Sequence, residues 1–97
     1  MAELLNEEQV TEALSALPQW RQDDAALTRT AELPSFTDAI RVVNRVAEIA
    51  ENDNHHPDID IRWRTLTFRC STHSVGGISA LDVSLAREID GVLEALG

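Results

Sequence analysis

The spacing of hydrophobic residues changes along the chain, and each change marks a predicted helix or strand. Asn6 is a favourable N-cap, and Glu7 and Glu8 suit the positive end of a helix. Apolar residues then recur at helical spacing until a proline stops the segment: Val10, Leu14, Leu17 and Pro18. The sequence therefore predicts a first helix that ends near Pro18.

Residues 19–33 have the pattern of two short strands. Trp20 stands in a short run, Asp23-Asp24 is typical of a turn, and the residues after it place Leu27, Ala31 and Leu33 at alternate positions. This alternation predicts an antiparallel pair of strands.

A second helix is predicted to start at Ser35, because Asp38 follows three residues later in a variant of the capping box. It should run to about Glu51. Its predicted apolar stripe is Phe36, Ile40, Val43, Ala47 and Ala50, and its polar side is Asp38, Arg41, Arg45 and Glu48.

The C-terminal segment repeats this signal after Gly76-Gly77. Ser79 and Asp82 form another Ser-x-x-acid cap. The apolar residues that follow predict the buried stripe of a last helix: Leu81, Leu85, Ile89, Val92, Leu93 and Leu96.

Between these helices, two runs alternate strictly between apolar and polar residues. Ile59, Ile61 and Trp63 have one phase, and Leu66, Phe68 and Cys70 have the other. A two-residue loop at Arg64-Thr65 restores the phase, and it predicts the pairs Trp63 with Leu66, Ile61 with Phe68, Ile59 with Cys70 and Asp60 with Arg69.

Together these elements predict an α+β fold in the order α-β-β-α-β-β-α. We expect one domain over residues 1–97, with a four-stranded antiparallel sheet and three helices packed on one face. The other face should be mixed polar. The edge strands favour self-association, because an exposed edge offers unpaired backbone groups.

The charge balance excludes several classes of function. The chain has 17 acidic residues against 8 basic ones, all Arg, and a net charge of −9. The lack of a basic patch argues against direct binding to nucleic acid or an anionic membrane. The lack of Lys excludes a Schiff base and a P-loop lysine.

Compartment signals are few. The single cysteine, Cys70, cannot form an internal disulfide. The first residues contain three Glu and lack the basic and apolar parts of a signal peptide, and no stretch has the length of a membrane span. We expect a cytoplasmic protein.

All 3 histidines, His55, His56 and His73, fall around the predicted hairpin. Extending its register makes His56 and His73 a cross-strand pair, so the imidazoles should meet near one end of the sheet. Imidazole both donates and accepts protons at neutral pH, which suits a reaction that needs an acid and a base on one small substrate.

Other interpretations of these residues stay open. The histidines could be ordinary surface or core residues, or zinc ligands, although the neighbours His55 and His56 splay apart on any regular element. Cys70 with His73 could form a thiol nucleophile, but the hairpin places Cys70 on the apolar side. A serine triad is also conceivable from Ser71, Ser74 or Ser79 with His73 and Asp82, without a nucleophile-elbow pattern to support it.

The order of Glu51, His55-His56-Pro57, Trp63, Thr72-His73 and Asp82 resembles the pterin-4a-carbinolamine dehydratase family. The likeness covers about residues 35–95, and Trp20 is a further match. The resemblance implies removal of water from a 4a-hydroxytetrahydropterin to give the quinonoid dihydropterin, without a metal or an organic cofactor. That activity recycles the cofactor of aromatic amino acid hydroxylases.

The resemblance also implies roles for individual residues. His55 and His73 are similar to an acid–base pair, His56 to an orienting or assisting histidine, and Glu51 to a supporting carboxylate, with Asp82 in a further supporting position. The segments that would line the pterin are His55, His56 and Pro57, and Thr72, His73, Ser74 and Val75.

The sequence departs from the family pattern at two positions. Ser74 stands where an acidic residue is frequent, and Trp63 where Tyr or Phe is also common. Members of the family are often dimers or tetramers, so we expect a homodimer or homotetramer. Some family-like proteins are assembly factors, and the mammalian member also assists a transcription factor, so the alternative is a non-catalytic protein-binding scaffold.

Overall fold

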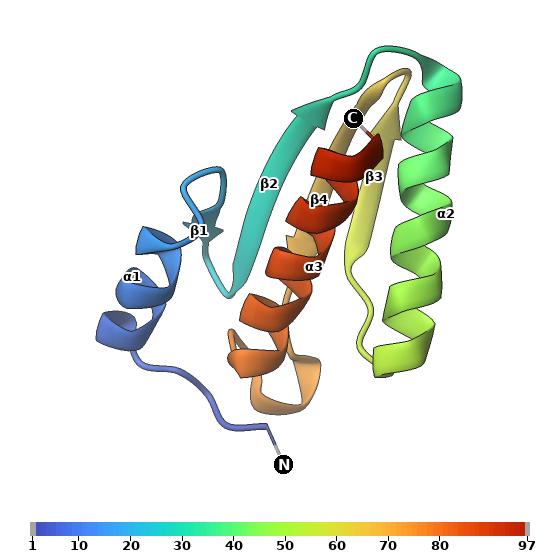
Figure 1. Ribbon diagram of the computed structural model, residues 1–97. Coiled ribbons are helices and arrows are strands. Elements are labelled where there is room, and N and C mark those ends of the chain that lie inside the picture. Colours follow the sequence, from blue (N-terminus) through green and yellow to red (C-terminus); the bar gives the residue numbers. More distant parts are fainter. Residues whose placement is uncertain (1, 97) are drawn as a thin grey trace.

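The computed structural model describes residues 2–96 of the chain (Figure 1). Three α-helices, four strands and one short 3-10 helix follow one another in the predicted order. Their bounds are α1 Glu7–Ser15, β1 Arg21–Asp23, β2 Ala26–Glu32, α2 Phe36–Asp53, β3 Asp58–Arg62, β4 Thr65–Cys70, η1 His73–Val75 and α3 Ala80–Leu96.

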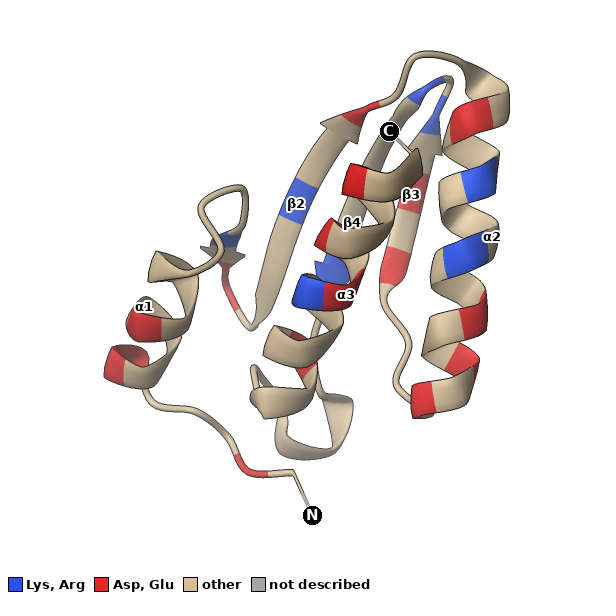
Figure 2. Cartoon of the chain, viewed as in Figure 1, with Lys and Arg blue, Asp and Glu red and all other residues tan. Residues whose placement is uncertain are grey.

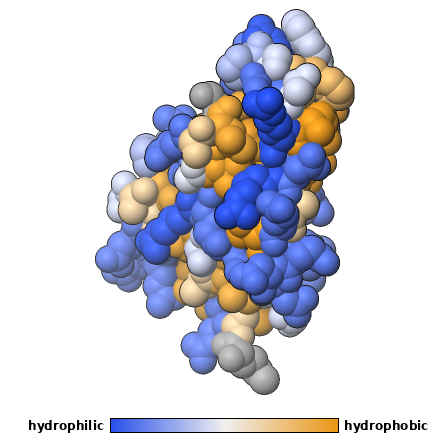
Figure 3. All heavy atoms as spheres, turned by 45° about the vertical axis from the view of Figure 1, so that its right-hand side comes forward, coloured by the Kyte–Doolittle hydropathy of each residue, from blue (hydrophilic) through white to orange (hydrophobic). Residues whose placement is uncertain are grey.

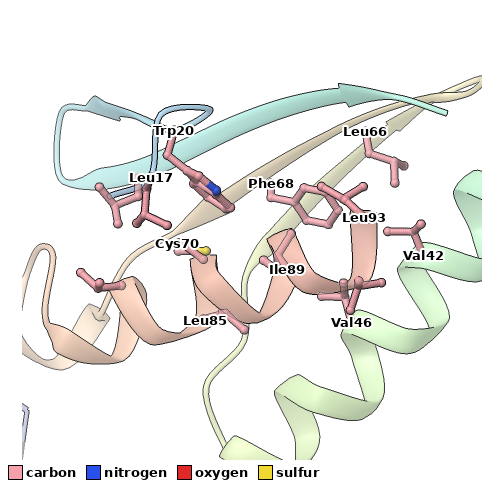
Figure 4. Packing of buried hydrophobic residues seen from close by; sticks show 14 of the residues in the cluster. Leu17, Trp20, Val42, Val46, Leu66, Phe68, Cys70, Leu85, Ile89 and Leu93 are labelled. Atoms are coloured by element: carbon pink, nitrogen blue, oxygen red, sulfur yellow. The ribbon is translucent and has the colours of Figure 1, made fainter. Parts of the chain in front are cut away.

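The strands form one antiparallel sheet in the order β1-β2-β4-β3, and the helices cover one of its faces (Figures 1 and 4). This arrangement confirms the predicted fold class. The core lies between the sheet and the helices, where apolar residues of α2 and α3 pack on those of the central strands. The helices contribute Val42, Val46, Leu85 and Ile89, and the strands contribute Leu27, Leu66, Phe68 and Cys70.

Local signals placed the helix starts correctly. The Asn6 side chain accepts a hydrogen bond from the Gln9 backbone N–H, and the Gln9 side chain accepts one from the Asn6 N–H, which completes a capping box. Ser35 accepts from the backbone N–H of Asp38 at the start of α2. These short-range bonds explain why capping residues predicted both starts.

The predicted register of the β3–β4 hairpin is wrong by two residues. Ile61 lies opposite Leu66 and not Phe68, and Ile59 lies opposite Phe68 and not Cys70. The loop is therefore Trp63-Arg64, and Trp63 adopts a left-handed backbone with φ of 54°. A shift by two keeps every side chain on its predicted face, so alternation alone does not separate the two registers.

The same shift corrects two further expectations. His56 and His73 are not a cross-strand pair, because β3 begins at Asp58 and the Asp58–Arg69 pair sets a different register. The second correction concerns Trp63, which was predicted to lie opposite Leu66. It lies instead at the tip of the hairpin and is 71% exposed, and the Arg64 guanidinium lies 4.8 Å from its ring centroid.

The buried stripe of α2 is rotated from the predicted one. The residues that face the core are Ala39, Val42, Val46 and Ala50, whereas Phe36 is 51% exposed and Ala47 is exposed. The helix carries apolar residues over a wider arc than the sheet and α3 can cover. The periodicity therefore predicts the helix correctly but does not show which of its apolar residues face the core. In α3, Leu81 and Leu96 are likewise exposed, while the middle of the predicted stripe is buried.

No helix within residues 2–96 combines the length and the apolar character that crossing a membrane requires.

Candidate active site

An open pocket of about 460 Å³ lies where α2 ends and β4 leads toward α3, and all 3 histidines line it. Its walls come from two segments that are distant in the sequence, together with the first turn of α3: residues 54–58, residues 71–74 and Leu81. The site thus lies at the end of the sheet opposite to the β3–β4 turn (Figure 1).

Left-handed backbone conformations turn the chain at both walls. Asn54 ends α2 with φ of 52°, and its N–H bonds to the carbonyl oxygens of Ala50 and Glu51. Asn tolerates this conformation better than most residues. Gly76 ends η1 with φ of 68°, and Thr72 and Gly77 then form an isolated antiparallel bridge that closes the loop.

The buried carboxylate of Asp82 holds the imidazole of His55. Its carboxylate has no exposed surface, and its Oδ1 lies 2.7 Å from Nε2 of His55, whose side chain is 12% exposed. The other oxygen, Oδ2, accepts hydrogen bonds from the Thr72 hydroxyl at 2.7 Å and from the Ser79 backbone N–H at 2.9 Å. A buried carboxylate requires such partners, because leaving it unpaired costs several kcal/mol.

The other two histidines have different surroundings. His56 pairs through Nε2 with Oε2 of Glu51 at the end of α2, and both side chains are exposed. His73 begins η1 on the opposite wall, is exposed, and forms no side-chain hydrogen bond within residues 2–96. The site therefore combines one mostly covered imidazole, held by Asp82, with two accessible ones.

Most residues singled out from the sequence gather here. Six of them line the pocket: His55, His56, Pro57, Thr72, His73 and Ser74. Glu51 contacts the site through His56, and Asp82 lies beneath it, whereas Val75 is not among the lining residues. Thr72 is only 4% exposed, so its hydroxyl is turned toward Asp82.

Sequence reasoning missed the lining residues Asn54, Asp58 and Leu81, and it named Ser71 only as a candidate nucleophile. The Asn following a helical pattern was a usable C-cap signal for Asn54. Leu81 follows the helical stripe of α3 and was assigned to the core for that reason, yet it is 44% exposed and forms part of the wall.

The end of the molecule that carries the site is acidic (Figure 2). Asp58 lines the pocket, and no Arg is among the lining residues that the structure describes. A neighbouring hollow of about 370 Å³ shares His55 and is lined by Asp53 and Glu88 as well. There, a hydrogen bond with Asp53, together with partial burial and the negative charge of Asp53, raises the pKa of Glu88.

Three of the alternative nucleophiles are placed unfavourably, namely Cys70, Ser71 and Ser79. Cys70 has no exposed surface, and burial, with smaller contributions from Asp82 and Asp58, raises its pKa to about 12, so the reactive thiolate is disfavoured. Ser71 donates to the carbonyl oxygen of Ala25, and Ser79 is buried against Thr72. Within residues 2–96, no three His, Cys, Asp or Glu side chains converge as metal ligands.

Two other grooves lie away from the histidines. One, of about 430 Å³, runs between α2 and α3 and is mainly apolar, and the other, of about 520 Å³, separates α1 from α3. Figure 3 shows apolar surface on either side of a polar band in the upper half of the molecule. Neither groove gathers titratable groups suited to proton transfer, so the histidine pocket is the candidate active site.

Proteins of one known family are similar to this chain in sequence and in architecture. A profile for pterin 4 alpha carbinolamine dehydratase matches residues 3–92. A protein of Nocardia farcinica that is provisionally named a pterin-4-alpha-carbinolamine dehydratase is 54% identical over 88 residues, or 91% of this chain and 93% of that protein. A protein of Mycobacterium avium with the same provisional name is 53% identical over 90 residues, covering 93% and 96% of the two chains.

Solved structures give the same result for the fold. A transcriptional coactivator/pterin dehydratase from Brucella melitensis superposes with a TM-score of 0.91 at 30% identity, covering 98% of this chain and 100% of the other. A pterin dehydratase-like protein, identified as a RuBisCO assembly factor in the alpha-carboxysome, shares the fold with a TM-score of 0.64 at 12% identity, over 75% and 84% of the chains. On these grounds the chain belongs to the pterin 4 alpha carbinolamine dehydratase family.

Proposed function

We propose that the protein removes water from a 4a-hydroxytetrahydropterin by histidine acid–base catalysis. The reaction breaks the C4a–O bond, adds a proton to the departing hydroxyl to form water, and removes a proton from a ring nitrogen to leave the quinonoid dihydropterin. The observation that carries the proposal is that all 3 histidines line one open pocket, with one held by a buried carboxylate. Positioned groups of this kind typically contribute about 10²–10⁴ in rate.

In this mechanism His55 and His73, on opposite walls of the pocket, act as the acid–base pair. His56, paired with Glu51, orients or assists. The two segments that carry these residues also supply backbone groups to the flat pterin ring. Pro57, Thr72 and Ser74 belong to those segments and line the pocket, and Val75, which follows Ser74 outside the pocket lining, completes the proposed binding segment.

The charge of the pocket supports a substrate without phosphate groups. Asp58 is negative and no Arg lines the described pocket, so a phosphorylated ligand would meet repulsion from Asp58 without a bidentate arginine partner. A pterin that carries only neutral side-chain groups, such as 4a-hydroxytetrahydrobiopterin, fits this requirement. Recycling of tetrahydrobiopterin for a hydroxylase is the corresponding role in the cell.

The deciding experiment measures dehydration of synthetic 4a-hydroxytetrahydropterin by the purified protein against the spontaneous rate. We expect catalysis by the wild type, and a loss of about 10²-fold or more in His55→Ala and His73→Ala. Thr11→Ala, on the exposed side of α1, controls for handling and should keep the full rate. A wild-type rate equal to the spontaneous one would instead support a protein-binding scaffold with this fold.

We also propose that the protein is a homo-oligomer joined through β3, which is an edge strand. An antiparallel copy centred on Asp60 would place Asp58 opposite Arg62, and Ile59 opposite Ile61. Opposite charges and apolar pairs at these positions stabilise strand pairing. Ile61 is 43% exposed in the single chain, so pairing would remove it from water.

Light scattering tests this interface through charge exchange. We expect a mass of at least twice the 10.7 kDa chain for the wild type, a smaller mass for Arg62→Asp, and recovery in the double variant Asp58→Arg/Arg62→Asp. A wild-type monomer, or an Arg62→Asp protein that keeps the wild-type mass, would rule out association through this edge.

A further inference from the structure

The carboxylate beneath the pocket is the end of a directional chain of hydrogen bonds that reaches Leu81. The Thr72 and Ser79 hydroxyl oxygens lie 2.7 Å apart, and both residues are buried. The Ser79 oxygen also accepts a bond from the backbone N–H of Leu81 at 3.2 Å. Thr72 lies between β4 and η1, and Ser79 lies between η1 and α3.

Counting protons fixes the direction of each bond. An ionised Asp82 only accepts, so the single hydroxyl proton of Thr72 is given to Oδ2. The contact between the two hydroxyls must then be a donation from Ser79 to Thr72. By the same count, the bond between Oδ1 and His55 requires the proton to lie on Nε2 of the imidazole.

This assignment leaves Nδ1 as the nitrogen of His55 that can exchange a proton. Within residues 2–96, Nδ1 forms no hydrogen bond, whereas Nε2 is committed to the buried carboxylate. A carboxylate that holds one imidazole tautomer and stabilises the imidazolium is a known device of acid–base enzymes. The device works only while the carboxylate itself is fixed, and here two donors fix Oδ2.

We infer that Thr72 is a positioning residue whose hydroxyl, through Asp82, holds His55 in the tautomer with the proton on Nε2. This inference gives Thr72 a role apart from lining the pocket, since its side chain is buried and its hydroxyl bonds to Asp82. Its consequence for catalysis rests on the proposed dehydratase function. Its consequence for the tautomer of His55 does not.

The test compares Thr72→Val with Thr72→Ser. Valine keeps the branched shape and removes the hydroxyl, whereas serine keeps the hydroxyl. Nitrogen-15 NMR of the histidine rings reports the tautomer directly. We expect a single Nε2–H form of neutral His55 in the wild type and in Thr72→Ser, and a mixture of both tautomers in Thr72→Val.

Activity gives an independent measurement. A lost bond to a charged group corresponds to about a tenfold change, so kcat for dehydration should fall about tenfold in Thr72→Val, with little change in KM, and recover in Thr72→Ser. If Thr72→Val folds poorly in urea titration, Ser79→Ala provides a second variant. It keeps the backbone donor to Asp82, removes the hydroxyl that bonds to Thr72 and to the Leu81 backbone N–H, and should shift the tautomers in the same direction.

The outcomes separate the two proposals. A shifted tautomer in Thr72→Val, in a wild-type protein without dehydratase activity, supports the positioning role and overturns the function. A folded Thr72→Val protein with unchanged His55 tautomers overturns the positioning role, even if its activity falls.

Discussion

Replacing Asp82 by Asn is the sharpest test of how the site works, because it changes one atom type and little volume. Asp82 accepts bonds from the His55 ring, the Thr72 hydroxyl and the Ser79 backbone N–H. The amide oxygen of Asn can keep the last two bonds, including the bond to the Ser79 backbone N–H that closes the cap of α3. The amide nitrogen must then face Nε2 of His55, where two donors meet.

The magnitude follows from these contacts. Losing a hydrogen bond to a charged group costs about 1.5–3 kcal/mol, which is about 10- to 10²-fold in rate if the bond matters fully in the transition state. His55 relieves the conflict by moving its proton to Nδ1, which removes the acceptor expected to face the substrate. We therefore predict that kcat/KM falls by at least about 10-fold, and by up to about 10⁴-fold if the whole contribution of acid–base assistance is lost.

Stability separates this effect from simple damage to the fold. Asp82→Asn should unfold in urea within about 1 kcal/mol of the wild type, because the cap of α3 survives. Asp82→Ala leaves buried donors on Thr72 and Ser79 without partners, at about 1–3 kcal/mol each. That is a large part of the roughly 5–15 kcal/mol available to a domain of this size.

The assay is stopped-flow dehydration of 4a-hydroxytetrahydropterin, with urea unfolding of the same samples. An Asp82→Asn protein that folds normally and keeps the wild-type kcat/KM would refute the role assigned to the carboxylate, and with it the fixed tautomer of His55.

Further predictions concern single residues. Burial raises the pKa of Cys70 to about 12, so the thiol should resist alkylation at pH 8 in the folded protein and react on unfolding. Because the unfolded thiol ionises near pH 9 and the folded one near pH 12, the free energy of unfolding should fall by up to about 4 kcal/mol between these pH values. This pH dependence should be absent from Cys70→Ala. The pKa of Glu88 is raised by its bond with Asp53, so its contribution to stability grows as pH falls through the raised pKa and is unfavourable above it. Glu88→Gln should therefore raise the thermal midpoint at pH 7 relative to the wild type, and equal midpoints at that pH would contradict the repulsion. Gly76→Ala, at φ of 68°, should lower the free energy of unfolding by about 1–2 kcal/mol in urea titration, and Gly76→Asn by less; an unchanged midpoint for Gly76→Ala would show that the loop relaxes.

The sequence alone determined the elements and their order, because these depend on neighbours within a few residues. Capping bonds at Asn6 and Ser35 join residues three apart, and the alternation in β4 reflects one buried face. The gathering of the histidines was also predictable, although the specific pairing of His56 with His73 was wrong. The site survives this error, since a two-residue shift moves a side chain along a strand without turning it over.

Only the tertiary structure decided which groups touch. His55 and Asp82 are 27 residues apart in the sequence. The sequence pattern predicted that Asp82 caps α3, but it did not show that the same carboxylate also forms a hydrogen bond with a histidine. The burial of Thr72, the exposure of Trp63 and the rotated contact line of α2 have the same origin. Periodicity in the sequence shows which face of an element is apolar. Which residues on that face contact one another depends on how the elements pack together, and this is decided by the packing of the whole chain.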